Sequence, residues 1–241
     1  MVITDEAYEY FVFDDARHVS IASLPGMAER TISCYTLTKT YAMTGWRIGY
    51  LHAHQRWVAQ ITKSHIPLAI CAPVVSQYAA LAALTGPQDS VTEMVEEFKV
   101  RRDILVDGLN ELPGFRCHKP LGAFYVFPSI EWPGSDWDFA TGLLKEKGVV
   151  TVPGSGFGER PGSKHFRIVL LPTEEQLSRA MDLSPEDEGL TALRDELTEG
   201  TTRERDGDLT RTHGWTSSAR PAIPPVTSEA SMRRPGVAVV T

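Results

Sequence analysis

Hydrophobic and polar positions along the chain follow two different periods. Short runs rich in β-branched and aromatic residues predict strands in the first part of the chain, at 2–4, 10–15, 30–38 and 45–53. Apolar residues at steps of three and four predict the helices that follow, at 54–65, 72–86 and 90–112. The longest of these helices begins with Ser90 and Glu93 in capping-box spacing, and Pro113–Gly114 stops it.

Strands and helices go on alternating beyond that stop. The predicted strands lie at 115–119, 123–130, 148–152 and 166–171, and the predicted helices at 138–147 and 173–183. Thr173 and Gln176 are expected to cap the last helix. This alternation indicates the α/β fold class. We expect the long helix to connect two lobes, at 1–88 and 89–183.

The character of the chain changes at about Ser184. The remaining residues are polar, rich in Thr, Arg, Pro and Glu, and show no apolar period beyond a helical turn or two at 188–197. Such a segment buries too little apolar surface to offset the entropy of ordering it. The composition therefore predicts a disordered tail at 184–241.

Composition and charge narrow the class of protein. The chain is 42% hydrophobic, enough for a packed core, and its formal net charge of −7 offers no basic field for nucleic acid. No run approaches the ~20 apolar residues of a membrane-spanning helix. Cys34, Cys71 and Cys117 lie far apart without a CxxC pair, which favours a reducing compartment over a disulfide scaffold. Since the first residues also lack the layout of a signal peptide, we expect a cytoplasmic protein.

Candidate chemistry gathers where the predicted strands end. Asp5 follows the first strand, with Tyr8 three residues on. The segment TLTKTYAMTGWRIGY places Thr36, Thr38 and Lys39 at the end of the third. Ligands of open α/β sheets bind at the carboxyl ends of the strands. A lysine that does chemistry must be placed and partly desolvated, which a lysine at the surface does not need.

An arginine completes this set. Arg47 stands between Gly45 and Gly49, small residues that let a backbone approach a ligand closely. The set then holds a carboxylate, a phenol, two hydroxyls, an amine and a guanidinium. These groups suit a cofactor with a cationic ring nitrogen, a phenolate, an aldehyde and a phosphate, and pyridoxal 5′-phosphate has all four. Taken singly, each residue also has an ordinary structural reading, such as a helix cap for Asp5 or a solvated surface position for Lys39.

The order of these motifs resembles a known family. DEAY at 5–8 followed by TLTKTYAMTGWRIGY at 36–50 is similar to the active-site core of class I/II aminotransferases, the fold-type-I pyridoxal-phosphate enzymes related to aspartate aminotransferase. Further segments agree in order over residues 1–183, namely SQYAALAAL, LGAFYVFP, GVVTVPGSGFG and FRIVLL. The resemblance implies part of a three-layer α/β/α large lobe that binds the cofactor, followed by a small α+β lobe.

The resemblance also implies a role for the residues that meet the cofactor ring. Lys39 would form the Schiff base with the cofactor aldehyde and then shuttle the proton between the substrate α-carbon and the cofactor. Asp5 would pair with the pyridinium nitrogen and keep it protonated, so that the ring withdraws electrons. Tyr8 would hydrogen-bond the 3′ oxygen of the ring.

Other residues would hold the phosphate and the substrate. The resemblance implies Thr36 and Arg47 as phosphate ligands, with Thr38 beside them in the cofactor site. Arg167, in FRIVLL, would grip the α-carboxylate of an amino acid or a 2-oxo acid through two parallel hydrogen bonds. The implied activity is amino group transfer between these two kinds of substrate, with the donor undetermined.

Relatives in this family carry a long segment before DEAY and work as homodimers. The resemblance therefore implies that this chain is the carboxyl-terminal part of such an enzyme, and that activity needs the amino-terminal part. Two alternatives stay open: an inactive fragment that holds no cofactor, and a pyridoxal-phosphate lyase with the same core.

Two further patterns carry less chemistry. His52 and His54 form an HxH pair with no third ligand nearby, so we expect no metal site. The PGSGFG loop lacks the Lys-Ser/Thr ending of a phosphate loop, and we interpret it as a turn of the small lobe.

Overall fold

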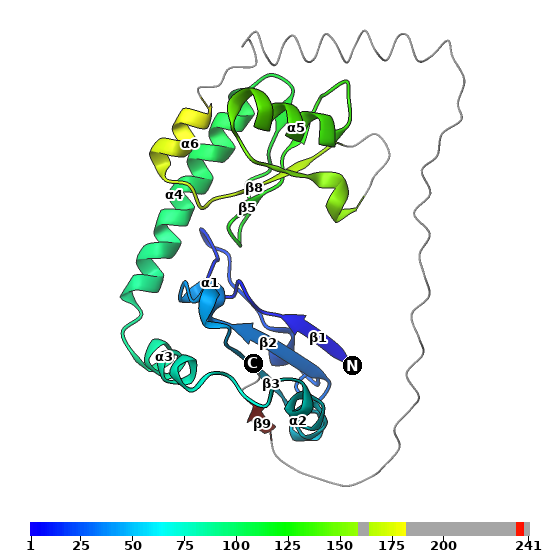
Figure 1. Cartoon of the computed structure of the whole chain (residues 1–241), viewed down its shortest axis with the longest axis vertical. Coiled ribbons are helices and arrows are strands. Elements are labelled where there is room, and N and C mark those ends of the chain that lie inside the picture. Colours follow the sequence, from blue (N-terminus) through cyan, green and yellow to red (C-terminus); the bar gives the residue numbers. More distant parts are fainter. Residues whose placement is uncertain (159–163, 182–234, 239–241) are drawn as a thin grey trace, which may run out of the picture.

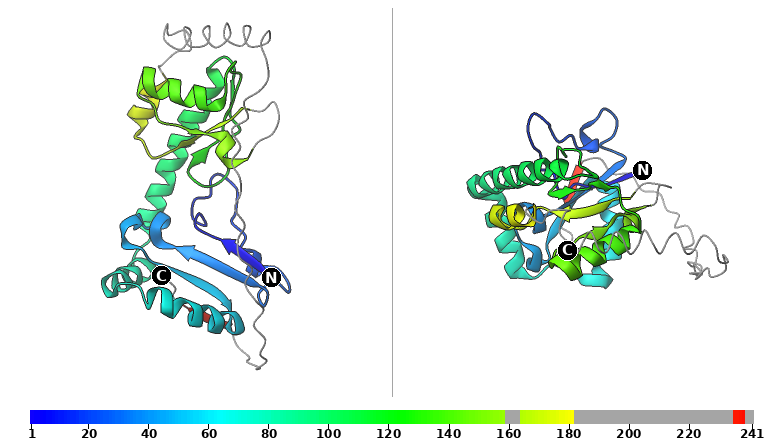
Figure 2. Two further views of the ribbon diagram at one scale, coloured as in Figure 1. Left: turned by 45° about the vertical axis from the view of Figure 1, so that its right-hand side comes forward. Right: turned by 90° about the horizontal axis from the view of Figure 1, so that it is seen from above.

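The computed structural model describes residues 1–158 and 164–181, together with the backbone of 235–238. Its elements form two groups that a long helix joins, as Figure 1 shows. We call them the sheet lobe, with its elements within residues 2–85, and the small lobe, with its elements within residues 115–181. The helix α4 (Asp89–Glu111) runs along one side from the first lobe to the second (Figure 2).

The sheet lobe is built on three strands near the amino terminus. β1 (Val2–Asp5) pairs in parallel with β2 (Thr31–Thr36), and β2 pairs antiparallel with β3 (Gly49–His54). β9 (Pro235–Ala238) adds an antiparallel strand beside β3. The register places Asp5 opposite Cys34 and Thr36 opposite Gly49. The carboxyl ends of β1 and β2 therefore lie at the same edge as the start of β3.

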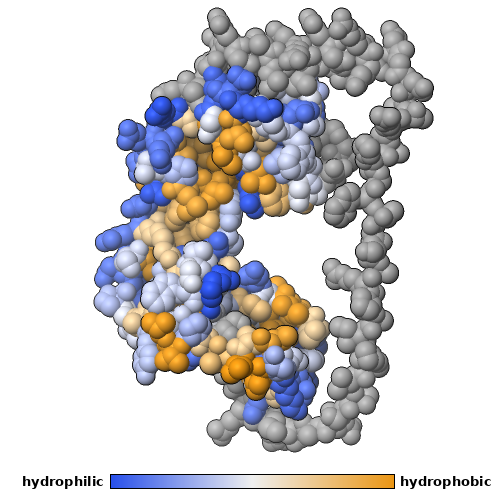
Figure 3. Space-filling model, in the orientation of Figure 1, coloured by the Kyte–Doolittle hydropathy of each residue, from blue (hydrophilic) through white to orange (hydrophobic). Residues whose placement is uncertain are grey.

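Two helices that follow the Lys39 motif in the sequence pack within the sheet lobe. α2 (Gln55–Ala69) covers one face through Trp57, Val58 and Ile61, which pack on the buried side chains of β2 and β3. α3 (Val74–Thr85) packs through Ala80 on the segment that follows β2. The opposite face of α3 stays apolar and exposed, and Figure 3 shows apolar side chains on the surface of this lobe. The exposed side chains are Val74, Val75, Tyr78, Leu81 and Leu84.

The small lobe consists of short strands and two helices. Its helices are α5 (Asp136–Lys147) and α6 (Glu174–Met181). The strands are β4 (Phe115–Arg116), β5 (Tyr125–Val126), β6 (Ser129–Ile130), β7 (Val152–Pro153) and β8 (Phe166–Val169). They form two antiparallel sheets, one of β4 and β6 and one in the order β5-β8-β7. A 3-10 helix, η3 (Gly154–Phe157), follows β7 directly.

Several element boundaries differ from the sequence-based predictions. The predicted strand at 30–38 ends at Thr36, because the side chain of Thr36 accepts a hydrogen bond from the Thr38 amide and starts α1 (Leu37–Thr40). The strand predicted at 45–53 begins only at Gly49, since a 3-10 turn, η2 (Thr44–Trp46), precedes it. The strand predicted at 123–130 is divided into β5 and β6.

The predicted helix caps fared unevenly. α4 begins after Gln88 without a side-chain cap, so the capping box expected at Ser90 and Glu93 is wrong. The cap of α6 is confirmed, because Thr173 and Gln176 exchange hydrogen bonds between side chain and amide. α5 starts two residues earlier than predicted, at a capping box formed by Ser135 and Asp138.

The strand predicted at 10–15 does not form. Only an isolated bridge between Val12 and Gly122 remains, and Phe11 and Phe13 are buried in the core of the small lobe. This core takes in Phe98, Leu105 and Leu109 of α4, Phe124, and Phe139 of α5. The aromatic residues at 10–13 therefore reflect burial in a core and not pairing in a sheet. The run stops at Asp14, whose φ of 57° turns the chain.

An ion pair between the buried Arg102 and the exposed Asp14 anchors residues 11–14, which we call the crossing segment. The guanidinium of Arg102 on α4 is fully buried and donates two hydrogen bonds to the carboxylate of Asp14, at 2.9 and 3.2 Å. It also bonds Asp103 at 2.8 Å and lies 4.8 Å from the ring centroid of Phe13. Residues 11–14 are thus packed and paired with the small lobe, although they precede the first boundary expected at residue 88. The two-lobe boundaries stay a prediction.

The tail expected at 184–241 falls outside the described residues except for β9, which is paired with β3. Within the described ranges, no helix is both long and apolar enough to cross a membrane.

Candidate active site

The sheet edge that carries the candidate chemistry follows from the strand directions. Asp5 is the last residue of β1, and Thr36 is the last residue of its parallel neighbour β2. Lys39 comes three residues after Thr36, within α1. Because β3 is antiparallel and starts opposite Thr36, Arg47 also lies at this edge, two residues before the strand.

The amine of Lys39 points at aromatic rings. Its Nζ lies 5.5 Å from the ring centroid of Phe124 and 6.0 Å from that of Tyr8. Within the described residues, this half-buried side chain makes no hydrogen bond or ion pair. The short helix α1 holds it in place, because Thr36 caps the helix and the buried Leu37 and Thr40 anchor it. The amine is thus positioned without a carboxylate to neutralise it.

Tyr8 is the hub of the cluster. Its hydroxyl shares a 2.9 Å hydrogen bond with the hydroxyl of Tyr125, and its ring meets Phe124 edge to face at 5.1 Å. Burial and the bond to Tyr125 raise the pKa of Tyr8 well above its ordinary value. The nearby Asp5 carboxylate raises this pKa further, while the guanidinium of Arg167 lowers it. Asp5 and Arg167, from different lobes, therefore both act on one phenol.

Asp5 is exposed at the end of β1. Its Oδ1 accepts a hydrogen bond from the Ala7 amide at 3.1 Å, an arrangement that turns the chain out of the strand. Beside it, burial raises the pKa of the Cys34 thiol, and the Asp5 charge adds to this effect. The other carboxylate oxygen remains available toward solvent.

Arg167 stands on β8 with its guanidinium between two rings. The Cζ atom lies 4.6 Å from the ring centroid of Tyr125 and 4.4 Å from that of Phe157. Its Nε–H is buried and has no hydrogen-bond partner among the described residues. A buried donor without a partner is costly and points to a group supplied from outside. The planar fork of a guanidinium fits a carboxylate there.

The predicted phosphate ligands Arg47 and Thr36 are engaged in hydrogen bonds within the chain. Arg47 is exposed, has a left-handed backbone at φ 47°, and donates from Nη1 to the Thr44 carbonyl at 3.1 Å. Thr36 already uses its hydroxyl to cap α1. Gly49 serves the sheet rather than a ligand, because a Cβ there would lie 2.5 Å from the Tyr35 carbonyl oxygen. A Cβ at Gly45 would meet no atom within 4 Å.

A buried carboxylate behind Asp5 was not predicted. Glu6 accepts hydrogen bonds at 2.9 Å from both Thr4 and Ser20, and His18 approaches it at 2.6 Å. These contacts tie His18 and Ser20, which follow the crossing segment, to the end of β1. The adjacent acids Asp5 and Glu6 look alike in the sequence. Which of the two side chains is buried depends on how the alternation of β1 continues at its end.

Sequence reasoning also missed the aromatic residues of the site. Phe124, Tyr125 and Phe157 lie in motifs that carried the family resemblance, but no role was assigned to them. Their contacts depend on β5 and η3 being brought to β8 and α1, which spacing in the sequence does not reveal.

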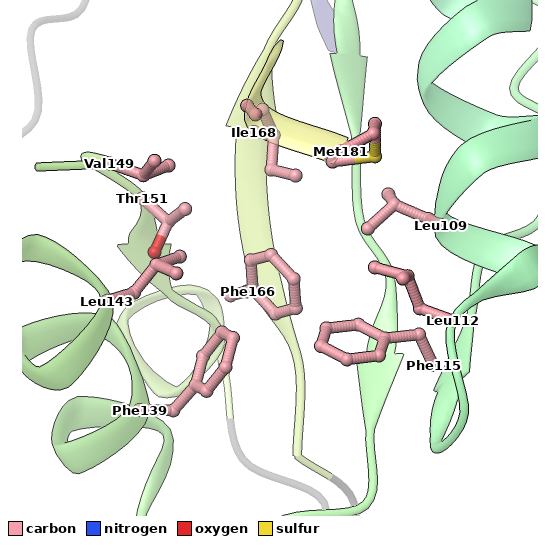
Figure 4. Close-up of a pocket in the computed structure, with 11 residues that line it drawn as sticks. Leu109, Leu112, Phe115, Phe139, Leu143, Val149, Thr151, Phe166, Ile168 and Met181 are labelled. Atoms are coloured by element: carbon pink, nitrogen blue, oxygen red, sulfur yellow. The ribbon is translucent and has the colours of Figure 1, made fainter. Parts of the chain in front are cut away.

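The small lobe contains an apolar cavity of about 70 Å³ that is separate from the candidate site. Side chains of Phe166 and Ile168 point into it from β8 (Figure 4). Arg167 lies between them, so strand alternation directs it to the opposite face. The cavity therefore lies on the face of β8 opposite to Arg167.

No metal site is found in the part of the chain that the structure describes. His54 uses Nδ1 to accept a hydrogen bond from the Arg56 amide, which caps α2.

Comparison with known proteins identifies the relatives of this arrangement. Residues 1–183 match the family described as aminotransferase class I and II. The chain is 43% identical over 185 residues to aromatic-amino-acid aminotransferase 2 of Thermococcus litoralis, covering 76% of this chain and 47% of that protein. It is 42% identical to an aspartate aminotransferase of Pyrococcus abyssi over the same shares of the two chains.

A solved structure shows the same fold. The crystal structure of an aromatic aminotransferase from Pyrococcus horikoshii matches with a TM-score of 0.71 and 40% identity, over 86% of this chain and 52% of that one. The expected fold, part of a fold-type-I large lobe followed by a small α+β lobe, is confirmed. The chain spans about half the length of the curated relatives it matches. Members of this family are generally dependent on pyridoxal phosphate.

Proposed function

Because this chain belongs to the class I and II aminotransferase family, we propose that its residues serve a pyridoxal-phosphate-dependent aminotransferase. The reaction is amino group transfer between an α-amino acid and a 2-oxo acid. The observation that carries the proposal is the cluster around Tyr8, where an amine, a phenol, a carboxylate and a guanidinium from both lobes meet.

The groups present fit this cofactor in kind. Pyridoxal phosphate, when bound, supplies an aldehyde that takes up amines and a ring that withdraws electrons. Lys39 offers an amine that no described carboxylate neutralises, and it faces rings rather than bulk water. A lysine that is placed and partly desolvated in this way suits covalent chemistry. We assign Lys39 the covalent attachment of the cofactor and the transfer of a proton at the substrate α-carbon.

Asp5 and Tyr8 would hold the ring. Asp5 has an exposed carboxylate oxygen at the strand end, which suits a cationic ring nitrogen. Tyr8 keeps its proton at neutral pH, since its pKa is raised, and can therefore donate a hydrogen bond to a phenolate oxygen. The hydroxyl of Tyr125 lies 2.9 Å from that hydroxyl and helps to hold it in place.

Thr36, Thr38 and Arg47 would hold the phosphate. The amide of Thr38 and the hydroxyl of Thr36 lie at the start of α1, and Arg47 brings a positive charge to the same sheet edge. The support for this assignment is the shared sheet edge, since the Arg47 guanidinium itself bonds the Thr44 carbonyl.

Arg167 would bind the α-carboxylate of the amino acid or 2-oxo acid. Its buried and unpartnered Nε–H and its position between two rings support this role. The identity of the amino donor is left open.

We propose further that the working protein is a homodimer, for which the exposed apolar face of α3 is the supporting feature. The cytoplasmic location stays a prediction. The alternative of a chain that holds no cofactor is favoured by the exposure of Asp5 and Arg47. A lyase with the same core has no feature of its own in its favour.

The attachment of the cofactor to Lys39 can be tested directly. The purified chain is incubated with pyridoxal phosphate, reduced with borohydride and digested, and the labelled peptide is identified by mass spectrometry. We expect the label on Lys39, its loss in Lys39→Ala, and its retention in Lys63→Ala, which removes an exposed lysine of α2. Label spread evenly over exposed lysines, with none favouring residue 39, would support the alternative without cofactor.

A further inference from the structure

The segment that covers Arg167 is fastened to the small lobe by a side chain that does not touch Arg167. Asp136 is the first residue of α5 and is only 9% exposed. Its Oδ2 accepts a hydrogen bond from the Ser155 amide at 2.6 Å, and its Oδ1 accepts one from the Ser155 hydroxyl at 3.1 Å. One carboxylate thus binds both donors of a single residue in η3.

A second contact fixes the start of the same segment. The Gly154 amide donates to the His165 carbonyl of the chain leading into β8, at 2.8 Å. A Cβ at Gly154 would lie 2.5 Å from that oxygen, so the backbone of η3 lies directly against this strand. Gly154 and Ser155 are therefore held from two sides, by β8 and by α5.

Phe157 follows two residues later, at the end of η3. Its ring centroid lies 4.4 Å from the guanidinium of Arg167, and its other ring neighbour is Phe127 at 5.9 Å. Phe157 is still 52% exposed, so packing alone holds it loosely. The hydrogen bonds of Asp136 supply the fixed point from which this ring is presented.

Two aromatic rings lie beside the guanidinium of Arg167. Tyr125 and Phe157 occupy its neighbourhood at 4.6 and 4.4 Å, and rings at such distances favour contact with the face of a guanidinium. Its N–H donors lie in the plane, where a carboxylate binds with two parallel bonds. A ring that shifts would release the guanidinium to other rotamers and weaken that recognition.

We propose that Asp136 is a positioning residue for carboxylate recognition at Arg167, acting through Ser155 and Phe157. This inference rests on the proposed function for the nature of the carboxylate, that of an amino acid or a 2-oxo acid. Asp136 contacts neither the substrate nor Arg167; it holds the 3-10 turn that places the ring.

The state of the carboxylate agrees with this role. Burial opposes ionisation of Asp136, but the hydrogen bonds from Ser155 and from the backbone amides of Asp136 and Trp137 together outweigh it and hold the pKa below the ordinary value. The group is therefore ionised at neutral pH. Asp136 also lies in the first turn of α5, where an acid favours the helix. A test must separate the two effects.

The test uses the full chain and two readouts. Hydrogen exchange of the Ser155 amide reports the fastening of η3, and NMR titration with pyruvate, read at the side-chain Nε–H of Arg167, reports carboxylate binding. In Asp136→Asn we expect Ser155 exchange to rise about tenfold or more and the dissociation constant for pyruvate to rise about three- to tenfold. Ser155→Ala, which leaves α5 intact, should weaken pyruvate binding in the same direction.

Three further variants make the result specific. Glu146→Gln removes an exposed carboxylate from the same helix and should change neither readout. Phe157→Leu should weaken pyruvate binding while Ser155 exchange stays slow. Unchanged pyruvate affinity in Asp136→Asn, despite faster exchange, would overturn the proposal. If the unaltered chain shows no response of Arg167 to pyruvate, or if Arg167→Lys binds equally well, then the assigned role of Arg167 fails and the inference fails with it.

Discussion

At the residue scale, the side chains that sequence motifs could assign differ from those that set their environment. Lys39, Asp5 and Tyr8 stand in motifs whose spacing points to strand ends, so the amino-acid sequence alone proposes them as site residues. Tyr125 could not be chosen in this way, because its contact with Tyr8 joins residues 117 positions apart. The electrostatics of the cluster therefore depend on a partner that local sequence does not reveal.

Replacement of Tyr125 tests this dependence. Tyr125→Phe removes the hydrogen bond that favours the protonated form of Tyr8, so the pKa of Tyr8 should fall toward the ordinary value of about 10 while burial still holds it above. The measurement is the ¹³C NMR shift of Tyr8 Cζ across about pH 8 to 12, assigned with Tyr8→Phe. An unchanged titration would mean that burial alone sets the pKa.

The raised pKa also has a sign for stability. A group whose pKa is higher in the folded state stabilises the fold fully below its unfolded-state pKa and loses that contribution as the pH rises through the folded value. Tyr8 should therefore contribute at neutral pH and lose its contribution only in strong alkali. Tyr125→Phe should bring that loss to a lower pH.

At the element scale, long periodic helices were predicted well and short strands poorly. α4 differs from its prediction by one residue at each end, because its apolar stripe is long and Pro113 stops it. The strand expected at 10–15 is absent, since aromatic residues suit a core as well as a pleated sheet. The start of β3 depends on the close approach of Gly49 to the Tyr35 carbonyl, which the sequence does not reveal.

Gly49 carries that approach, and its replacement is a direct test. A Cβ at this position would lie 2.5 Å from the Tyr35 carbonyl oxygen, which is backbone and has little room to move. We expect Gly49→Ala to lower the free energy of unfolding by about 1–3 kcal/mol. Gly45→Ala, four residues earlier, meets open space and should have little effect. Urea denaturation of both variants decides it; equal stabilities would contradict the register.

At the scale of the whole molecule, the two lobes are interleaved. Residues 11–14 leave the sheet lobe, enter the core of the small lobe and pair with Arg102 before the chain returns. The sequence indicated two lobes through the long helix, but it placed residues 11–14 wholly in the first. Pairing between distant segments is decided by packing, and a single sequence shows no trace of it.

Separate expression of the second part tests the interleaving. A chain of residues 89–181 lacks Phe11 and Phe13, and truncating a buried Phe alone costs about 3–5 kcal/mol. It also leaves Arg102 without Asp14. We expect no cooperative thermal unfolding of 89–181 by circular dichroism, whereas 1–181 should unfold cooperatively. A sharp transition for 89–181 would show that the lobes fold independently.

Residues 37–48 form a loop whose two ends are joined by the pairing of Thr36 with Gly49. Changes of length inside that loop leave its two ends where they are. A slip of β3 by one residue does not, because it would reverse the faces of Tyr50 and His52 and carry Arg47 along the edge. Such a slip would place Ile48 or Tyr50 where Gly49 now lies against the Tyr35 carbonyl. Both residues bear a Cβ, which would clash there. Because only glycine fits at position 49, β2 and β3 can pair in one register. That register also sets the spacing between the Lys39 amine and the Arg47 guanidinium.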